Sequence, residues 1–401
     1  MSNASTNIYK IDFQGKALVL PDNFFSQNPN SWLSSDWNPQ LPLQIIDTRE
    51  FGWEAHCKSR YLPELFPNPK ELPRFSKKDD THHLELDVIG TSFYMLTRYE
   101  EFVSTKKDKH ERFPFGESIS SHEDLVNRPI INEYLEILWE CLSRLFPNLK
   151  RKHRNFRINL SHDIDRPQFV HTPGKSGTSY DTLSHYEKLV GFAENNNLKS
   201  SFYFLTAVTE PKIDADYTLD DDEIKNLLIL INHSGHEIGL HPSYNTFDNP
   251  EQTKKEWLLL RKSCEALNIN QDRWGGRQHY LRFETPKTWR NWESAGIHYD
   301  STLGFAEHPG FRCGICYEYP VFDLQNSETL NLLERPLIWM DDSLLSKVYM
   351  GFQVDSDEAI SYTLEIKDIC RKYNGDFNLL YHDNYLIEPS HFQFLENIIA
   401  S

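Results

Sequence analysis

The chain has 401 residues, with 42 Lys and Arg against 59 Asp and Glu, which gives a formal net charge of −17. Aromatic residues make up 13% of the sequence, so the chain has the composition of a folded protein with a sizeable core rather than a disordered one. The acidic balance disfavours proteins that bind nucleic acid or an anionic membrane surface, because both activities need clustered Lys and Arg.

The length suggests two or three domains at ~100–200 residues each. No apolar run approaches the ~18–20 residues of a membrane helix. Met1 to Asp22 lacks a basic region followed by an apolar stretch, so we expect no signal peptide. Six cysteines are spread along the chain, too sparsely for a disulfide scaffold, and Cys313 and Cys316 have no second pair with which to bind zinc. We therefore expect a cytoplasmic protein.

The N-terminal part of the chain mixes strand and helix signals without a clear rhythm. Lys16 to Leu20 and Leu43 to Ile46 are strand-like, and Thr91 to Phe102 is helix-like. A further helical pattern, Ile131 to Leu145, ends just before the basic stretch 150–154. We predict a domain boundary there, with a smaller α/β domain at residues 1–150 and a second domain at residues 151–401.

From residue 155 onward, strand and helix signals alternate. The predicted strands are Phe156 to Leu160, Ser201 to Leu205, His236 to Leu240, one starting at Trp274, Ile297 to Tyr299, Pro336 to Met340 and Phe377 to Tyr381. The predicted helices are Tyr186 to Ala193, Asp220 to His233, Lys254 to Leu267, Thr288 to Ala295 and Glu358 to Tyr373. Such alternation is typical of a parallel sheet, and seven or eight units favour a β/α barrel.

Polar residues gather where the predicted strands end. The carboxyl ends of barrel strands meet on one face, which is where active sites lie, so we expect these residues to share a cleft. The clusters are Ser161 to Asp165, His241 to Asn245, Gly275 to Tyr280, Tyr299 to Ser301 and Leu380 to Asn384.

Carboxylates and imidazoles in one cleft favour hydrolysis. A carboxylate and an imidazole can hold a divalent metal with positions open for water and substrate. A second carboxylate can accept a proton from water, and an imidazole can protonate a departing amine. Hydrolysis of an amide needs that acid, because an amine anion is a poor leaving group.

Three short motifs carry a resemblance to a known family. Asp163-Ile164-Asp165 has the form Asp-x-Asp, Gly235 to Gly239 precedes His241, and Leu380-Tyr381-His382 has the form Leu-x-His. With these motifs, residues 155–400 resemble the NodB-homology polysaccharide deacetylases, carbohydrate esterase family 4. The resemblance implies a distorted β/α barrel that removes acetyl groups from N-acetylated sugars with a bound divalent metal, for which we expect Zn²⁺.

The resemblance also assigns roles to individual residues. It makes Asp163 the catalytic base and His382 the general acid. It makes Asp165 and His241 metal ligands. Arg277 matches the arginine that orients the base.

Other positions depart from the family pattern. Asn245 stands where the family has a second metal-binding histidine; its amide is a weaker ligand than imidazole, so it is either a ligand or a neighbour of the ligands. His279 and Tyr280 replace a proline and an aromatic residue, and Asp300 lacks the Trp of its motif. We assign these three to substrate binding, although Asp300 can instead cap a turn. Asp341 ends another predicted strand. It either contacts substrate or acts as an orienter, or it lies in a solvated loop.

The N-terminal part has a resemblance of its own. Met95 to Glu101, Arg112 to Pro114 and Arg128 to Ile130 are similar to an uncharacterised domain that precedes the deacetylase domain in a bacterial subgroup. Some members of that subgroup occur with genes for surface-polysaccharide biosynthesis, so this resemblance brings a context but no mechanism.

Together these observations predict a metal-dependent hydrolase that deacetylates an N-acetylated sugar. A small-molecule, nucleotide-linked or lipid-linked sugar from surface-polysaccharide biosynthesis fits a cytoplasmic enzyme. One alternative is a cyclic-amide hydrolase that works without metal on the same fold. Others are a non-catalytic sugar-binding protein with a degraded metal site, or a working N-terminal domain with the barrel as scaffold.

Overall fold

The computed structural model describes residues 8–69, 72–167 and 182–401. The chain forms two compact units whose boundary in the sequence lies at Asn155, five residues beyond the expected one. Each unit also contains a short segment from the other side of that boundary. Unit 1 comprises Met1–Lys106, Gly116–Asn155 and Phe311–Cys316, and unit 2 comprises Lys107–Phe115, Phe156–Gly310 and Tyr317–Ser401.

Unit 1 contains a four-stranded mixed sheet. Its strand order is β1 (Ile8–Phe13), β2 (Lys16–Pro21), β6 (Thr81–Leu84) and β5 (Phe75–Lys78). The β2–β6 pair is parallel and the outer pairs are antiparallel. A separate antiparallel pair joins β3 (Gln44–Asp47) to β4 (Tyr61–Glu64). Both strands that the sequence predicts here, in β2 and β3, are present.

The helices of unit 1 are α1 (Val88–Leu96), α2 (Tyr99–Val103) and α3 (Ile130–Leu145). Helix α3 packs on β2, β6 and α1. The single helix predicted at Thr91 to Phe102 is wrong, because Arg98 has φ of +54° and breaks it. In this conformation the buried Arg98 guanidinium donates to the carboxylates of Glu100 at 3.0 Å and Glu101 at 2.9 Å.

Unit 2 is built on one large sheet. Its strands, in sequence order, are β7 (Arg157–Ile164), β8 (Ser201–Leu205), β9 (Glu237–His241), β10 (Gly275–Gly276), β11 (Tyr299–Asp300), β12 (Tyr319–Asp323), β13 (Glu328–Glu334), β14 (Trp339–Met340) and β15 (Asp376–Leu380). Their spatial order is β12-β13-β11-β10-β9-β8-β7-β15-β14. All neighbours pair in parallel except β12 and β13, which form an antiparallel hairpin that the sequence analysis missed.

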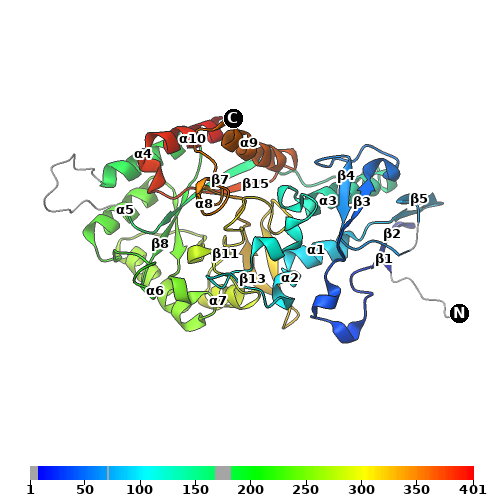
Figure 1. The fold of residues 1–401 in the computed structure, drawn as a ribbon, viewed down its shortest axis with the longest axis horizontal. Coiled ribbons are helices and arrows are strands. Elements are labelled where there is room, and N and C mark those ends of the chain that lie inside the picture. The colour runs from blue at the N-terminus through cyan, green and yellow to red at the C-terminus, as the bar shows by residue number, and fades with distance from the viewer. Residues whose placement is uncertain (1–7, 70–71, 168–181) are drawn as a thin grey trace. The chain divides into compact units, whose positions relative to one another are not determined.

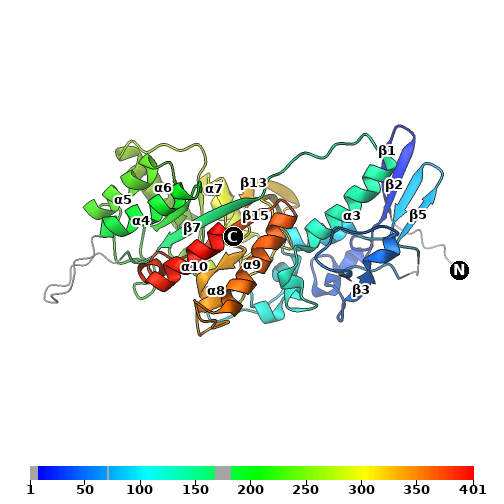
Figure 2. The same ribbon diagram turned by 90° about the horizontal axis from the view of Figure 1, so that it is seen from above.

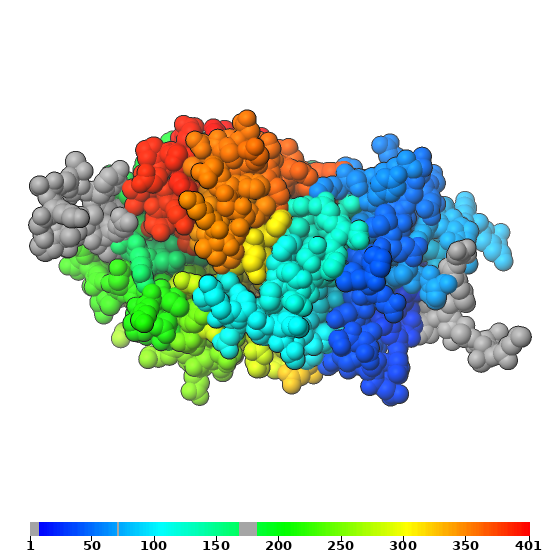
Figure 3. Space-filling view, in the orientation of Figure 1, coloured from blue at the N-terminus to red at the C-terminus, as the bar shows by residue number. Residues whose placement is uncertain are grey.

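Helices surround this sheet, as Figure 1 shows for α4 to α7, α9 and α10. They are α4 (Thr182–Asn195), α5 (Asp222–His233), α6 (Pro250–Ala266), α7 (Lys287–Ala295), α8 (Asp341–Leu345), α9 (Asp357–Lys372) and α10 (Pro389–Ala400). Helices α9 and α10 lie side by side in Figure 2 and form adjoining orange and red surfaces in Figure 3. The predicted alternation of parallel strands with helices is thus present in unit 2.

Closure of the sheet into a barrel is incomplete in the strand pairing. Within the residues that the structure describes, no ladder joins the two edge strands of the sheet, β12 and β14. The sheet therefore has one seam that backbone hydrogen bonds do not close. The carboxyl ends of β7, β9, β10, β14 and β15 nevertheless lie along one edge, because neighbouring parallel strands keep their ends together.

Two further expectations concern cysteine and membrane association. All six cysteines are described and buried, and none of them forms a disulfide. Across the described ranges, no helix is both long enough and apolar enough to cross a lipid bilayer.

A close backbone contact sets the spacing of β9 and β10. Gly276 pairs with Leu240, and a Cβ atom built on Gly276 would lie 1.8 Å from the carbonyl oxygen of Leu240. Only glycine permits this approach. Because His241 and Arg277 follow directly in the two strands, the contact also brings their side chains to one place.

We expect Gly276→Ala to destabilise unit 2 by about 1–3 kcal/mol or more, because the new methyl group must push apart two paired backbones. Thermal or denaturant unfolding measures the change. Gly191→Ala is the matched control: Gly191 is helical and has open space around its Cα, so alanine there should stabilise by about 0.5–1 kcal/mol. Equal stability of Gly276→Ala and the native chain would contradict the close contact.

Candidate functional site

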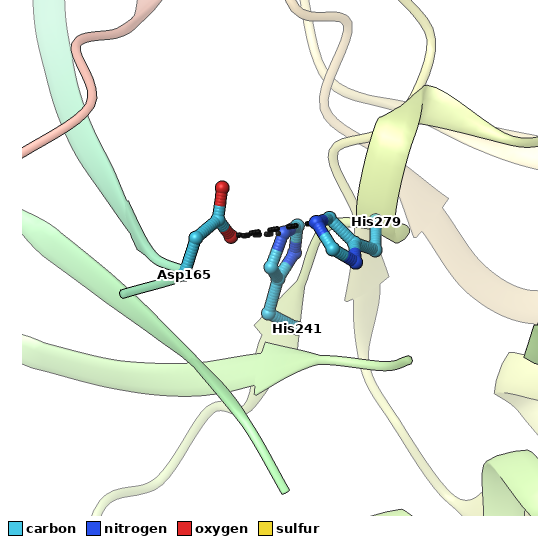
Figure 4. A group of neighbouring side chains, drawn as sticks. All are labelled: Asp165, His241 and His279. Carbon is cyan, nitrogen blue, oxygen red and sulfur yellow. Dashed lines mark ion pairs between the residues drawn. The ribbon is translucent and has the colours of Figure 1, made fainter. Parts of the chain in front are cut away.

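Three side chains from three strand ends meet in a potential cation site. Asp165 follows β7, His241 ends β9 and His279 lies in the loop after β10. One ligand atom from each lies within 4.8 Å of the others, and Figure 4 shows the two imidazoles beside the carboxylate. The Asp165 oxygen lies 3.1 Å from Nε2 of His241 and 3.7 Å from Nε2 of His279.

Hydrogen bonds on the far side of each ring fix which nitrogen faces Asp165. Nδ1 of His241 lies 2.5 Å from the backbone carbonyl oxygen of Arg277, which only accepts hydrogen bonds, so Nδ1 carries the proton. Nδ1 of His279 donates in the same way to Asp214, at 2.9 Å. Both rings therefore turn Nε2 toward the same carboxylate, and in its neutral form each ring presents a lone pair there.

This arrangement fits a divalent cation. Two nitrogen lone pairs and a carboxylate oxygen repel one another unless positive charge lies between them. Oδ1 of Asp165 is moreover a buried atom that accepts no hydrogen bond from the described residues. One carboxylate and two imidazoles are a ligand set that catalytic zinc uses, with positions left open. We therefore regard Asp165, His241 and His279 as residues able to hold Zn²⁺ or a similar ion.

Asp214 supports this cluster from behind. Its Oδ1 accepts from His279 and from the backbone N–H of Tyr244, and its Oδ2 accepts from Thr209 and Glu210. Burial raises the pKa of Asp214, but the hydrogen bonds from His279 and three backbone amides have the larger effect and lower the pKa to about 2. A permanent carboxylate thus joins the loops after β8, β9 and β10.

A second buried carboxylate, Asp163, lies next to the cluster. Oδ1 of Asp163 accepts from Arg277 at 2.8 Å, and Oδ2 lies 3.8 Å from Nε2 of His241. Arg277 is only 1% exposed and also donates to Ser161 and Ser301, so its guanidinium is held on three sides. The ion pair fixes the carboxylate with one oxygen directed toward the cation site.

His382 lines the same space and follows β15, the strand that pairs with β7. Its Nδ1 lies 2.7 Å from Oδ1 of Asp341, whose other oxygen accepts from the His382 backbone N–H at 2.8 Å. Burial lowers the pKa of His382, but the charge of Asp341 and this hydrogen bond raise it by more, to well above its ordinary value. His382 is therefore protonated near neutral pH and can donate a proton through Nε2.

The three residues of the cation site, together with Asp163 and His382, border one cavity of about 410 Å³ within unit 2, a size typical of small-ligand sites. One wall is apolar and contains Leu281, Ala306, Met340 and Leu380. The remaining wall includes the segment Lys107–Phe115, which we call the strap. From the polar side the cavity is lined by Asp163, Asp165, His241, His279 and His382.

The structure separates the predicted residues into two groups. It brings Asp163, Asp165, His241, Arg277, His279, Tyr280, Asp341 and His382 to the cavity or into direct contact with its lining. Asn245 and Asp300 lie elsewhere. Asn245 is exposed, and its amide donates to the carbonyl of Thr209 and accepts from Arg282. Both of its polar atoms thus have partners outside the cation site.

Asp300 is fully buried and does not line the cavity. Its Oδ1 accepts from the backbone N–H of Thr302 at 3.0 Å and from the Thr302 hydroxyl, as a turn-capping aspartate does. Burial raises the pKa of Asp300 to about 7. The structure thus shows Asp300 in the turn-capping arrangement and away from the cavity lining.

Sequence reasoning placed His279 on the substrate side and did not consider Asp214. A signal for His279 was present, because the histidine missing at position 245 is matched by an additional one at position 279. Asp214 had no local signal, since it lies in an irregular loop 65 residues before the ring it contacts.

Comparison with known proteins divides the chain in a similar way. A family of unknown function, DUF7033, matches residues 10–147. No curated protein matches the chain.

Solved structures resemble about three fifths of the chain. A protein from Mycobacterium smegmatis assigned as a polysaccharide deacetylase is 19% identical over 63% of this chain and 85% of its own, with a TM-score of 0.41. The chitin deacetylase of Colletotrichum lindemuthianum is 11% identical over 63% and 84%, with a TM-score of 0.35. PuuE allantoinase is 12% identical over 61% and 83%, with a TM-score of 0.38. These similarities are remote, so function must be argued from the site.

We expect Asp214→Asn to weaken Zn²⁺ binding by about 10–100-fold, because the carboxylate fixes the tautomer and orientation of His279. In a His279→Gln background the same change should cost no further affinity, since Asp214 then has no ligand to orient. Competition calorimetry on the four proteins measures the cycle.

Two control variants separate this role from loop structure. Thr209→Val removes another hydrogen bond to the same carboxylate and should leave Zn²⁺ affinity nearly unchanged. Asn245→Ala should do the same, because the Asn245 amide is occupied by Thr209 and Arg282. Additive losses from Asp214→Asn and His279→Gln would show that Asp214 does not act through the ring.

Proposed function

We propose that unit 2 is a metal-dependent hydrolase that removes the acetyl group from an N-acetylated sugar. The observation that carries the proposal is the arrangement around one cavity: three residues able to hold a cation, a carboxylate clamped by Arg277, and His382, whose Nδ1 is held by Asp341. These are the parts that amide hydrolysis requires, in positions where one substrate can meet all of them.

Asp165, His241 and His279 would hold the metal ion. When bound there, a divalent cation supplies electrophilic polarisation of the acyl carbonyl group. His279 takes the place that the sequence left to Asn245, so the proposed ligand set again has two imidazoles. Zn²⁺ is the ion that this set of donors suits.

Asp163 is the proposed general base. Arg277 holds one of its oxygens, which leaves the other to accept a proton from the attacking water. The same ion pair keeps the carboxylate from turning away, so the base stays oriented without help from substrate. A base that is fixed before binding needs no reorganisation during the reaction.

His382 is the proposed general acid. Breakdown of the tetrahedral adduct expels the sugar amine, which must receive a proton as the C–N bond breaks. Asp341 keeps His382 protonated and directs Nε2 away from the pair, toward the cavity. Asp341 is thus an orienter in this proposal and does not itself contact substrate.

The cavity walls support a sugar as substrate. Tyr280 lines the cavity with 40% of its surface exposed, and Tyr349 and Tyr385 also contribute to the lining. Aromatic rings with a polar edge provide an apolar face for a sugar ring and a hydroxyl for its substituents. The acidic net charge disfavours a nucleic-acid partner. We assign the reaction to a cytoplasmic step in surface-polysaccharide biosynthesis.

The direct test is release of acetate and free amine from N-acetylglucosamine by the purified chain loaded with Zn²⁺. Asp163→Asn should lower turnover by roughly 10²–10⁴ and leave Zn²⁺ affinity intact, because Asp163 is not in the ligand set. Activity that survives chelation, on a cyclic amide rather than a sugar, would favour the metal-independent hydrolase. Sugar binding without turnover in the native chain would favour a binding protein.

The Asp341–His382 pair predicts a pH effect of known sign. The acid must be protonated, so activity falls as pH rises through the pKa of His382. Asp341→Asn removes the charge that raises this pKa, and the alkaline limb of kcat/KM should therefore move to lower pH.

The same variant should affect an activated acetate ester much less than an N-acetyl sugar, because a good leaving group needs no proton. A lower rate with the alkaline limb unmoved would mean that Asp341 only positions His382.

A further inference from the structure

The strap, Lys107–Phe115, is an unexpected part of the cavity. It comes from the sequence before the barrel but belongs to unit 2, and Lys109, His110 and Arg112 line the cavity beside the proposed cation site. Resting on the proposed function, we propose that the strap closes one side of the cavity and restricts the enzyme to an N-acetylated sugar at a chain end or in a single-sugar conjugate.

Arg112 makes the strap a bridge across the face of the sheet. Its guanidinium donates to the backbone carbonyl of Tyr280 at 3.1 Å and to the hydroxyl of Tyr349 at 3.3 Å. Tyr280 follows β10 and Tyr349 follows β14. Between these two strands lie β11, β13, β12 and the unpaired seam. Asp108 accepts from the same guanidinium at 2.8 Å, so this charge is compensated within the strap.

Arg282 fastens the strap on the β9–β10 side. It donates to the carbonyl of His110 at 2.9 Å and to the carboxylate of Glu111. Its guanidinium lies 4.0 Å from the ring centre of Tyr244 and 4.1 Å from that of Phe247, and the residue is only 3% exposed. A buried, stacked arginine with two strap contacts is a permanent attachment rather than a surface ion pair.

The other end of the strap is fastened beyond β11. The ring of Phe115 packs 5.1 Å from the ring of Phe305, and its backbone N–H donates to Glu307 at 3.4 Å. In the middle, Nδ1 of His110 lies 2.9 Å from the hydroxyl of Tyr244. The strap therefore has attachments at both ends and along its length, with its inner side chains forming a wall.

The strap also holds an aromatic wall in an unfavourable backbone conformation. Tyr280 has φ of +60° and Leu281 has φ of +53°, which are left-handed values that bulky residues rarely adopt. Arg112 binds the carbonyl of Tyr280, and the ring of His110 lies 4.8 Å from that of Tyr280. The ring is thus fixed at the boundary between the cation site and the strap.

These contacts decide what shape of substrate fits. When a polysaccharide is deacetylated at an internal sugar, its chain must extend out of the cavity on both sides of that sugar. Here the direction past Tyr280 meets the strap, so the chain can continue only on the side of Asp342 and Tyr385, which line the rest of the cavity. A terminal sugar, or one sugar on a nucleotide or lipid carrier, meets this requirement.

Deacetylation of the β-1,4-linked N-acetylglucosamine tetramer, labelled with ¹⁸O at its reducing end, tests the proposal by mass-spectrometric sequencing. The native chain should remove one acetyl group, from one terminal residue. Its kcat/KM on the tetramer should stay within about threefold of that on the dimer, whereas further sugar subsites would add about tenfold or more. Loss of acetyl groups from internal residues would overturn the proposal and leave the proposed function standing.

Two strap variants make the test causal. Arg112→Ala removes the bridge, and Glu111→Ala removes one attachment to Arg282; either should raise internal relative to terminal deacetylation by about tenfold. Lys106→Ala, an exposed lysine outside the strap, is the charge-matched control and should keep the native pattern. An unchanged pattern in both strap variants would overturn the proposal.

A calorimetric titration separates the proposal from failure of the proposed function. On Asp163→Asn, the monomer and tetramer should bind with affinities within about threefold of each other. If the native chain neither binds nor hydrolyses any of these sugars, the proposed function fails and this inference fails with it.

Discussion

The buried ion pair between Arg277 and Asp163 is the interaction on which the site depends. A guanidinium that is only 1% exposed must be neutralised and hydrogen-bonded, and Asp163, Ser161 and Ser301 meet that need from two other strand ends. Gly276 lets β10 approach β9 closely, and Arg277, the next residue, reaches Asp163 on β7. The same electrostatic requirement recurs at Asp214 and Asp341, each of which is a buried carboxylate that holds one imidazole.

Much of unit 2 was predictable because its signals are local. The ends of β7, β9 and β15 follow from strand patterns that stop at Asp165, His241 and His382, and parallel pairing then brings those ends together. What failed depends on distant partners. Arg98, which breaks a helical pattern, donates to the backbone carbonyl of Arg312, 214 residues away in the sequence, and the ligand role of His279 depends on Asp214. The hairpin of β12 and β13 did have a signal, since Leu330 and Leu332 alternate with exposed residues.

In the candidate cation site, the second imidazole comes from a different loop than the one the sequence motif indicated. Asn245 and His279 lie in neighbouring loops, after β9 and after β10, and both are linked to the same surroundings. Asn245 contacts Arg282, which fastens the strap, whereas His279 receives the orienting carboxylate of Asp214. The position without an imidazole thus contacts the arginine that holds the strap, and the position with an imidazole belongs to the candidate cation site.

Arg277 acts on the site through two separate groups. Its side chain holds Asp163, but it is its backbone carbonyl that orients His241. Every amino acid has a carbonyl, so substitution of residue 277 removes the first contact and spares the second. Under the proposed function, loss of the arginine would therefore release the proposed base and leave the orientation of a proposed metal ligand intact. Mutation of this one residue would separate the proposed catalysis from the proposed cation binding.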